Sequence, residues 1–304
     1  YMSVGFSPAF YMDPKMKCIS LKSFREKTIS KSPADTVTPN MEWLAMNKLV
    51  PQLSCNFPLI IAHRGYKKKY PENTLAAFQA AMDSSVPMIE LDVTLSRDRK
   101  LVVIHDASLD RTTNGQGAVR AHTLEALKQL DAGSWFHPDF AGLRLPELAE
   151  VLKLVNGRVV TNIEIKSYAY EAHHPPDAIE KQVVELVKKT KLQDSVLISS
   201  FDCKVLEQIS LMQAPPSIAL ISKAPVQRNI VELCKRLKTF SWHPHQKIVT
   251  PTLVKKFHAA GIRVLPYGVD TQEDCARLVG FKVDGVITDD PVSARCWAKV
   301  KKAA

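Results

Sequence analysis

The sequence predicts an α/β protein built as a (β/α)8 TIM barrel, and three observations support this prediction. From Pro58 onward, short aliphatic and β-branched runs alternate with amphipathic stretches. Eight such runs fit into about 250 residues, the usual size of this barrel. A doubly wound open sheet is the alternative for such an alternation, but the chain lacks the glycine-rich first turn of that fold.

The expected strands are runs of four to seven residues rich in aliphatic and β-branched side chains. They cover residues 58–62, 87–93, 159–165, 195–199, 217–221, 239–242, 262–268 and 285–288. Helices are expected between most of them, at residues 74–82, 176–190, 204–212, 226–237, 252–260 and 272–279. Strands that alternate with helices in this way pair in parallel through right-handed crossovers.

A further aliphatic run, residues 101–104, follows the second strand after only a few residues. That connection is too short for a parallel crossover, so we expect an antiparallel hairpin. With a two-residue turn at Asp98 and Arg99, Asp92 would lie directly opposite His105. The hairpin would therefore bring His105 to the level of the acidic residues on the second strand.

Residues 1–56 differ from the rest of the chain and are expected to form a partly ordered N-terminal extension. They contain five prolines with scattered Ser, Thr and Lys. Only residues 41–49 look like a short helix, with Asn40 as a candidate N-cap. We expect the extension to take no part in the chemistry, so the predicted catalytic domain comprises residues 57–304.

Composition and charge exclude several classes of protein. With 45% hydrophobic and 24% charged residues, the chain is neither wholly disordered nor a coiled coil. No apolar run approaches the ~18 residues of a membrane helix, so we expect no transmembrane segment. The net charge of +10 favours phosphate-bearing ligands. We expect no nucleic-acid binding, because the chain has no basic stripe with interleaved aromatic residues.

The six cysteines are too sparse for a disulfide framework, and none forms a C-x-x-C pair. The N-terminal segment has no basic stretch followed by an unbroken apolar stretch, so it does not resemble a signal peptide. Together these features predict a cytoplasmic protein. The sequence does not predict an oligomeric state.

Acidic side chains gather where the barrel strands end, which is the active-site face of this fold. Glu90 and Asp92 are two residues apart and point to the same side of the second strand, and Glu164 lies on the next barrel strand. Three carboxylates without a cysteine favour a hard divalent ion, Mg²⁺ or Ca²⁺, over zinc. The alternative is a structural ion cluster in which these carboxylates pair with Arg64 and Lys166.

Two histidines are candidates for proton transfer. His63 ends the first expected strand, and His105 ends the return strand of the hairpin. Cleavage of a phosphodiester requires one proton to be taken from the nucleophile and another to be given to the leaving oxygen. A single histidine at a strand end is more often a buried structural residue. Two of them beside the same carboxylates favour an acid–base pair.

An ordered set of motifs resembles the glycerophosphodiester phosphodiesterase family. The motifs are His63-Arg64-Gly65, Pro71-Glu72-Asn73-Thr74, Glu90-Leu91-Asp92-Val93, Val103-Ile104-His105-Asp106, Leu109-Asp110-Arg111-Thr112-Thr113-Asn114-Gly115, Glu164-Ile165-Lys166, Ser200-Phe201 and Asp284-Gly285-Val286-Ile287-Thr288-Asp289. Each motif is weak evidence by itself, but the ordered set is highly specific. The resemblance extends from about residue 58 to residue 298, and residues 106–158 are similar to the family's insertion between the second and third barrel strands.

This resemblance implies a hydrolase that splits a small glycerophosphodiester into sn-glycerol 3-phosphate and an alcohol. The family's acid–base pair matches His63 and His105, and the positions that neutralise the phosphate match Arg64 and Lys166. Which histidine is the acid stays open at this point. It also stays open whether water attacks directly or a glycerol hydroxyl first forms a cyclic phosphate.

The family's metal ligands match Glu90, Asp92 and Glu164, and its usual ion is Mg²⁺ or Ca²⁺. Two positions depart from the family pattern. Tyr267 stands where the family often has Trp, and Arg99 follows Asp98 where the hairpin turn usually has Gly. Neither departure touches the expected ligands.

Two alternative functions remain open on the sequence. One is an enzyme that acts on intact phospholipids in the manner of phospholipase D toxins, although the chain shows neither the apolar rim nor the signal expected for it. The other is a phosphodiester-binding protein without catalysis, although no expected catalytic residue is missing.

Overall fold

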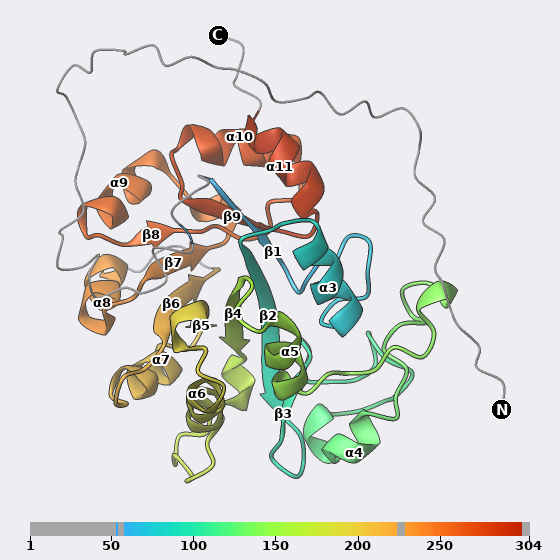
Figure 1. The fold of residues 1–304 in the computed structure, drawn as a ribbon. Helices are drawn as coiled ribbons and strands as arrows, with labels where there is room; N and C mark the ends of the chain where they lie inside the picture. Colours follow the sequence, from blue (N-terminus) through green and yellow to red (C-terminus); the bar gives the residue numbers. More distant parts are fainter. Residues whose placement is uncertain (1–52, 54–57, 224–228, 300–304) are drawn as a thin grey trace, which may run out of the picture. The chain divides into compact units, whose positions relative to one another are not determined.

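The computed structural model describes Leu53 and residues 58–223 and 229–299, and its main feature is a barrel of parallel strands. The strands are β1 (Leu59–Ala62), β2 (Met88–Leu95), β4 (Val160–Ile165), β5 (Val196–Ser200), β6 (Ser217–Ser222), β7 (Ser241–Pro244), β8 (Arg263–Val264) and β9 (Gly285–Thr288). They pair in the order β8-β7-β6-β5-β4-β2-β1-β9, and Figure 1 shows them surrounded by helices.

Hydrogen bonds between the two ends of this order close the barrel. The amide of Asp284, just before β9, donates to the carbonyl of Val264 on β8 at 3.0 Å, and the amide of Ile287 donates to Pro266 at 2.8 Å. The predicted (β/α)8 fold is therefore confirmed. Strand β8 is shorter than the run of residues 262–268 predicted from the sequence, although the amides of Leu265 and Tyr267 still donate to carbonyls of β7.

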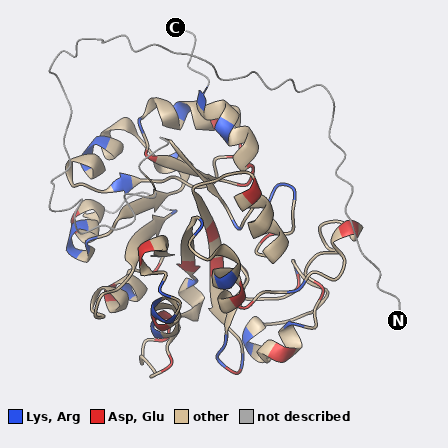
Figure 2. Ribbon diagram, in the orientation of Figure 1, with Lys and Arg blue, Asp and Glu red and all other residues tan. Residues whose placement is uncertain are grey.

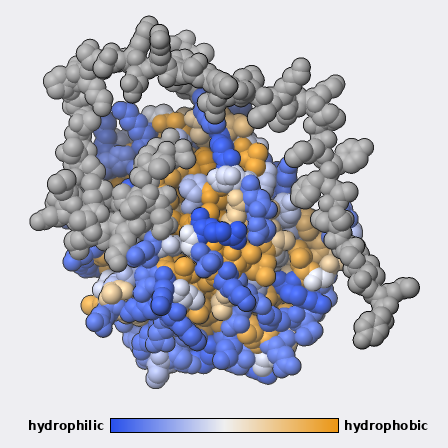
Figure 3. All heavy atoms as spheres, in the orientation of Figure 1, coloured by the Kyte–Doolittle hydropathy of each residue, from blue (hydrophilic) through white to orange (hydrophobic). Residues whose placement is uncertain are grey.

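The helices expected between the strands are also present in the described residues. They are α3 (Leu75–Asp83), α6 (Ile179–Lys189), α7 (Cys203–Ser210), α8 (Ile230–Leu237), α9 (Pro251–Ala259) and α10 (Gln272–Gly280). Helix α6 illustrates the pattern, since Ile179, Val183 and Val187 are buried at a spacing of four residues. Its outward side carries charged residues (Figure 2) and lies in a hydrophilic part of the surface (Figure 3).

In the described residues, two helices of two or more turns were not predicted. Helix α5 (Leu148–Val155) lies within the segment treated as an insertion, and α11 (Pro291–Lys299) follows β9. The insertion also contains the single-turn helix α4 (Leu124–Leu127) and packs around a small core that it shares with β3 and Ile104. The buried members of that core are Val102, Ile104, Leu109, Val119, Leu127, Ala132 and Leu145.

The predicted hairpin is present, but its predicted register is wrong by one residue. Strand β3 (Leu101–Val103) pairs antiparallel with β2 and places Val93 opposite Val103. Ile104, rather than His105, therefore lies opposite Asp92, and the Ile104 amide donates to the Asp92 carbonyl at 3.1 Å.

The cause of this shift is a three-residue turn in place of the expected two-residue turn. The amide of Ser96 donates to the carbonyl of Lys100 at 3.0 Å, so the turn comprises the three residues between them. Its last residue, Arg99, adopts a φ of 61°, the left-handed conformation that such turns require.

The barrel interior is divided into a hydrophobic lower layer and a polar upper layer. The lower layer contains the buried residues Leu53, Leu59, Ile61, Met88, Val160, Leu197, Ala219, Phe240, Leu265 and Ile287. The upper layer is polar and includes the buried side chains of Asn162, Glu164, Ser199 and His243. Hydrophobic packing thus fills the barrel at the amino ends of the strands, while polar side chains occupy the carboxyl ends.

The predicted extension, residues 1–56, lies outside the described residues except for Leu53, which is fully buried in the lower layer. The helix expected at residues 41–49 also lies outside them, as do residues 226–228 at the start of another expected helix. In the described part of the chain, no helix is long and apolar enough to cross a bilayer.

A glycine after β1 provides a test of how α3 packs against the barrel. Gly65 has a φ of 81°, and a Cβ there would lie 2.6 Å from the carbonyl carbon of Ala77 in α3. Gly65→Ala combines backbone strain with a clash, so we expect it to lower the free energy of unfolding by more than about 2 kcal/mol in urea titrations.

The matched control is Gly142→Ala. Gly142 has a similar φ of 84°, but a Cβ there meets nothing within 4 Å. This variant should show only the cost of the left-handed backbone, about 1–2 kcal/mol. Equal losses in the two variants would show that the contact between Gly65 and Ala77 does not limit the packing of α3.

Candidate active site

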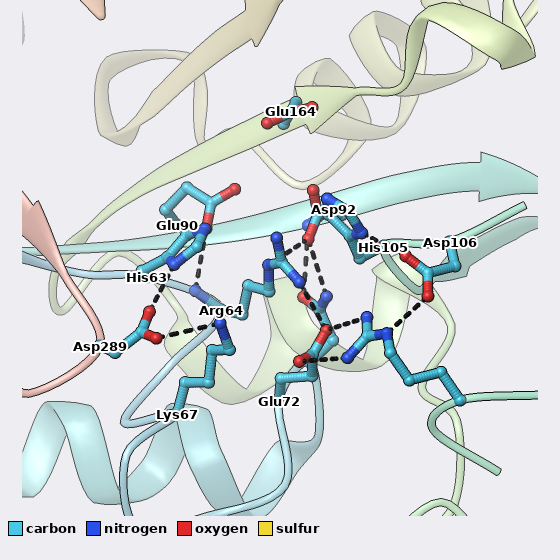
Figure 4. A network of polar contacts seen from close by, with 12 residues as sticks. His63, Arg64, Lys67, Glu72, Glu90, Asp92, His105, Asp106, Glu164 and Asp289 are labelled. Atoms are coloured by element: carbon cyan, nitrogen blue, oxygen red, sulfur yellow. Dashed lines mark hydrogen bonds and ion pairs between the residues drawn. The ribbon is translucent and has the colours of Figure 1, made fainter. Parts of the chain in front are cut away.

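The structure gathers the site residues expected from the sequence around one cavity of about 470 Å³. They are His63 and Arg64 after β1, Glu90 and Asp92 on β2, His105 after β3, and Glu164 and Lys166 at the end of β4. Figure 4 shows His63 toward Glu90 and His105 toward Asp92, with Arg64 between the two histidines. The convergence follows from the parallel strands, whose carboxyl ends meet at one face.

Three carboxylates form the centre of this site. Glu90, Asp92 and Glu164 each offer an oxygen within 4.8 Å of the others. Asp92 lies beside Glu164 in the register of β2 and β4, and all three side chains are buried. Their proximity follows from the alternation of side chains along β2 and from this register.

Burial and mutual repulsion make this cluster electrostatically unfavourable without a cation. Burial and the charges of Asp92 and Glu164 raise the pKa of Glu90 well above its ordinary value. Burial and the charge of Asp92 raise the pKa of Glu164 to about 7. A bound cation would reverse both shifts, so the residues fit a divalent ion with oxygen ligands.

Two basic side chains compensate part of the negative charge. Nζ of Lys166 lies 2.6 Å from Glu164 and 3.1 Å from Asp92, and Nε of Arg64 lies 3.2 Å from Asp92. Although burial by itself would raise the pKa of Asp92, the charges of Lys166 and Arg64 hold it below its ordinary value. Within the described residues, Glu90 has no ion-pair partner and accepts a hydrogen bond from the Arg64 amide at 2.8 Å.

Glu72 fixes the direction of the Arg64 side chain. Its carboxylate accepts from Nη1 of Arg64 at 2.7 Å and from both terminal nitrogens of Arg111, at 2.9 and 2.8 Å. Burial alone would raise the pKa of Glu72, but the hydrogen bonds and charges of the two arginines lower it to about 2. Glu72 is therefore ionised and shared between the barrel and the insertion.

Asn73 fixes Asp92 in a similar way. Its Nδ2 donates to Oδ2 of Asp92 at 2.9 Å, while the Asp92 amide donates to Oδ1 of Asn73 at 3.3 Å. Asn73 has a φ of 58°, a conformation that asparagine adopts more readily than most residues. The next residue, Thr74, caps α3 by accepting from the Ala77 amide.

Each histidine has a carboxylate partner. Nδ1 of His63 lies 2.6 Å from Asp289, which also accepts from Nζ of Lys67 at 3.0 Å. Burial would raise the pKa of Asp289, but the hydrogen bond from His63 and the charge of Lys67 lower it below its ordinary value. An ionised carboxylate can only accept, so Nδ1 carries the proton and Nε2 is left for other partners.

His105 is also held by a carboxylate that is paired with a basic side chain. Its Nδ1 lies 2.5 Å from Asp106, which accepts from Nε of Arg111 at 2.6 Å. The hydroxyl of Tyr168 donates to the His105 carbonyl at 2.9 Å and fixes the backbone. Burial lowers the pKa of His105, although the Asp92 charge opposes this shift.

The supporting residues Glu72, Asn73, Asp106 and Asp289 had no role assigned from the sequence alone. The sequence contained a signal for them, since each lies within one of the motifs quoted above. Spacing alone could not reveal their partners, because Asp289 lies 226 positions from His63 and Arg111 lies 39 positions from Glu72.

Comparison with known proteins identifies the family. A model of the glycerophosphoryl diester phosphodiesterase family matches residues 63–293. The chain belongs to this family. The resemblance and the enzyme class predicted from the sequence are thereby confirmed.

A glycerophosphodiester phosphodiesterase of Caldanaerobacter subterraneus is 42% identical over 237 residues, which cover 77% of this chain and 94% of the relative. A phosphodiesterase structure from Oleispira antarctica, in complex with the product sn-glycerol-3-phosphate, is 28% identical with a TM-score of 0.68 and covers 80% of this chain and 97% of its own. A glycerophosphodiester phosphodiesterase structure from Agrobacterium tumefaciens is 26% identical with a TM-score of 0.67 and covers 80% of this chain and all of its own (100%).

The low pKa of Glu72 predicts a specific pH dependence of stability. Its folded-state pKa of about 2 lies below the unfolded value of 4.5. The contribution of Glu72 to the free energy of unfolding is therefore present above pH 4.5 and is lost as the pH falls toward 2. Glu72→Gln should lower the free energy of unfolding at pH 7. The difference from the wild type should shrink by up to about 3 kcal/mol between pH 5 and pH 2.

Urea titrations at several pH values measure this difference. The control is Glu125→Gln, which changes an exposed carboxylate in α4 that forms no ion pair with the described residues. It should leave the free energy of unfolding nearly unchanged at every pH. A constant difference between Glu72→Gln and the wild type over the whole range would contradict the ionisation assigned to Glu72.

Proposed function

We propose that the protein hydrolyses small glycerophosphodiesters to sn-glycerol 3-phosphate and an alcohol, with the help of a divalent metal ion. The observation that carries this proposal is the buried carboxylate cluster. Arg64 and Lys166 flank the cluster, and His63 and His105 line the cavity that it faces. Membership of the family and the product bound to the Oleispira antarctica relative support the choice of substrate.

Glu90, Asp92 and Glu164 would hold the metal, since their oxygens lie close together and their excess charge requires a cation. Oxygen ligands of this kind suit Mg²⁺ or Ca²⁺. When bound, such an ion supplies Lewis-acid stabilisation of the phosphoryl oxygens.

Arg64 and Lys166 would stabilise the negative charge that develops on the phosphoryl oxygens. Both side chains are largely buried and held by carboxylates, so they need little reorganisation as the reaction proceeds. Burial alone would lower the pKa of Lys166, but Asp92 and Glu164 raise it, so its charge persists at neutral pH.

His63 and His105 would transfer the protons. In each ring Nδ1 is held by a carboxylate, Asp289 or Asp106, and Nε2 is the nitrogen left for the substrate. One histidine would take the proton of the nucleophile, and the other would protonate the leaving oxygen of the alcohol. Asp289 and Asp106 would stabilise the imidazolium form in each case.

The direct test is the release of sn-glycerol 3-phosphate from glycerophosphocholine, measured with Mg²⁺ or Ca²⁺ and again after chelation. We expect release that EDTA abolishes and added metal restores. Cleavage of lysophosphatidylcholine without cleavage of glycerophosphocholine would instead favour the phospholipase D-like alternative. Binding of glycerophosphocholine without any turnover would favour a non-catalytic binding protein.

A cytoplasmic location stays a prediction. It is supported by the free thiols of Cys203, Cys234, Cys275 and Cys296, which are typical of a reducing compartment. Fractionation of cells that express the native gene product measures it.

Removing a carboxylate should lower turnover and abolish the rise in Tm that the metal gives. Glu90→Gln, Asp92→Asn and Glu164→Gln should each lower kcat by at least about 10²-fold, because the site loses a ligand. They should also lose the rise in Tm that Mg²⁺ or Ca²⁺ gives the wild type, since a ligand that binds only the folded state stabilises it.

The matched control is Glu180→Gln in α6, a carboxylate that is equally buried but lies outside the cavity. It should keep both the turnover and the metal-dependent rise in Tm. Full activity of the wild type in excess chelator would rule out the metal site.

Removing either histidine should slow the reaction without removing the metal. His63→Ala and His105→Ala should each lower kcat by at least about 10²-fold, and the double variant should be little slower than either. The metal-dependent rise in Tm should persist in all three. His137→Ala, which removes an exposed histidine of the insertion, is the control and should keep normal turnover.

A p-nitrophenyl phosphodiester assigns the two roles, because p-nitrophenolate leaves without a proton. This substrate should restore the rate only in the variant that lacks the acid. Near-normal rates of both single variants on glycerophosphocholine would contradict the acid–base mechanism.

A further inference from the structure

Arg111 of the insertion holds two carboxylates that belong to different parts of the site. Its two terminal nitrogens donate to Glu72 at 2.9 and 2.8 Å, and its Nε donates to Asp106 at 2.6 Å. Glu72 also accepts from Nη1 of Arg64 at 2.7 Å. The other carboxylate oxygen of Asp106 lies 2.5 Å from Nδ1 of His105. One guanidinium thus connects a residue expected to neutralise the phosphate with a residue expected to transfer a proton.

The planar guanidinium fixes the two carboxylates relative to each other. It binds Glu72 with its terminal nitrogens and Asp106 with Nε, so all three donors belong to one rigid plane. These hydrogen bonds join charged groups, which makes them stronger than bonds between neutral groups. A lysine at this position would offer a single nitrogen and could not hold both carboxylates in the same way.

The backbone that carries Arg111 is anchored in the small core of the insertion. Leu109 is fully buried in that core. Its carbonyl accepts from the amide of Thr113 at 3.1 Å and from the hydroxyl of Thr113 at 2.8 Å, which closes a turn that contains Arg111. Thr112 and Thr113 are also buried. The guanidinium therefore extends from a turn whose position is fixed by packing.

Arg111 directs Asp106 toward His105. Burial would raise the pKa of Asp106, but hydrogen bonds from Arg111 and His105 lower it to about 2. An ionised carboxylate can only accept, so Nδ1 of His105 carries the proton and its Nε2 is left for other partners. The Asp106 side chain is 29% exposed, so without Arg111 it could turn toward water and release the ring.

Arg111 acts on the cavity through the groups that it holds. Arg64 and His105 line the cavity, whereas the three residues that hold them do not. A residue in this place does not contact the reacting atoms. Its effect on the reaction must therefore pass through Arg64 and His105.

We propose that Arg111 is a positioning residue for the reaction and holds Arg64 and His105 in place relative to each other. This inference rests on the proposed function, because it gives the insertion a part in that same reaction. Stabilisation of the phosphoryl charge and transfer of one proton then depend on one side chain outside the barrel. A displacement of about 1 Å in a catalytic group can cost about a hundredfold in rate, so the loss of Arg111 slows turnover.

A mutant cycle on the holoenzyme separates this role from a merely structural one. Arg111→Gln should lower kcat on glycerophosphocholine by about tenfold to a hundredfold and keep the metal-dependent rise in Tm. In a chain that already carries Glu72→Gln and Asp106→Asn, the same substitution should cost less than about twofold, because neither carboxylate is left to hold. Equal losses in the two backgrounds would overturn the proposal.

The matched control is Arg120→Gln. Arg120 also lies in the insertion, its side chain is 38% exposed, and it forms an ion pair with Glu171 at 3.1 Å, outside the cavity. This variant should keep the kcat of the wild type. A loss as large as that of Arg111→Gln would show that any arginine of the insertion has the same effect, and would overturn the proposal.

Proton NMR of the Mg²⁺-loaded protein gives a readout that does not depend on turnover. The Nδ1 proton of His105 should give a downfield resonance that His105→Ala removes, because it is held by Asp106. Arg111→Gln should shift or remove this resonance, whereas the resonance of His63, which Asp289 holds, should stay unchanged. An unchanged His105 resonance would overturn the proposal. A shifted resonance in a protein whose wild type releases no sn-glycerol 3-phosphate would contradict the proposed function and still support the positioning of His105.

Arg111→Lys decides the question if Arg111→Gln does not fold. This variant keeps the positive charge, but its single ammonium cannot hold both carboxylates. We expect its kcat to fall by about tenfold or more, with the metal-dependent rise in Tm retained. Turnover of Arg111→Lys at the rate of the wild type would overturn the proposal.

Discussion

The burial of three carboxylates at the ends of two neighbouring strands is the constraint on which the rest of the site depends. Glu90, Asp92 and Glu164 lie close together in a region from which water is largely excluded. Burial, together with mutual repulsion, raises the pKa of Glu90 and Glu164. Arg64 and Lys166 relieve part of this repulsion. Two cations cannot neutralise all three carboxylates when every one of them is ionised, and this imbalance is the reason that the cluster fits a further cation.

The same constraint links the barrel to the insertion. Arg64 can serve the carboxylates only while Glu72 holds it, and Glu72 is also bound by Arg111 of the insertion. Arg111 in turn holds Asp106, the partner of His105. A chain of ion pairs and charge-assisted hydrogen bonds therefore runs from the carboxylate cluster to one of the histidines. The insertion thereby fixes the orientation of the His105 ring.

The alternation of apolar runs and amphipathic stretches was sufficient to predict the fold, because it reflects local burial along each strand and helix. The hairpin register could not be predicted, because its turn is stabilised from outside. Arg99 is held in the left-handed conformation while its guanidinium binds Glu171, 72 residues away, and Asp177. The partner of His63 was missed for a similar reason, since a contact over 226 positions leaves no local pattern.

The inward-facing residues of β4 show how one strand can combine stability and chemistry. In order they are Val160, Asn162 and Glu164, with Lys166 directly after the strand. They belong to the hydrophobic lower layer, the polar upper layer, the carboxylate cluster and the cations. The residues between them are apolar or β-branched and face the helices. A shift of one position would bury the charges against the helices and fill the cavity with aliphatic groups. The register that packs the barrel is therefore also the register that assembles the site. The hydrophobic layer beneath the site stabilises an arrangement that the buried charges alone would oppose.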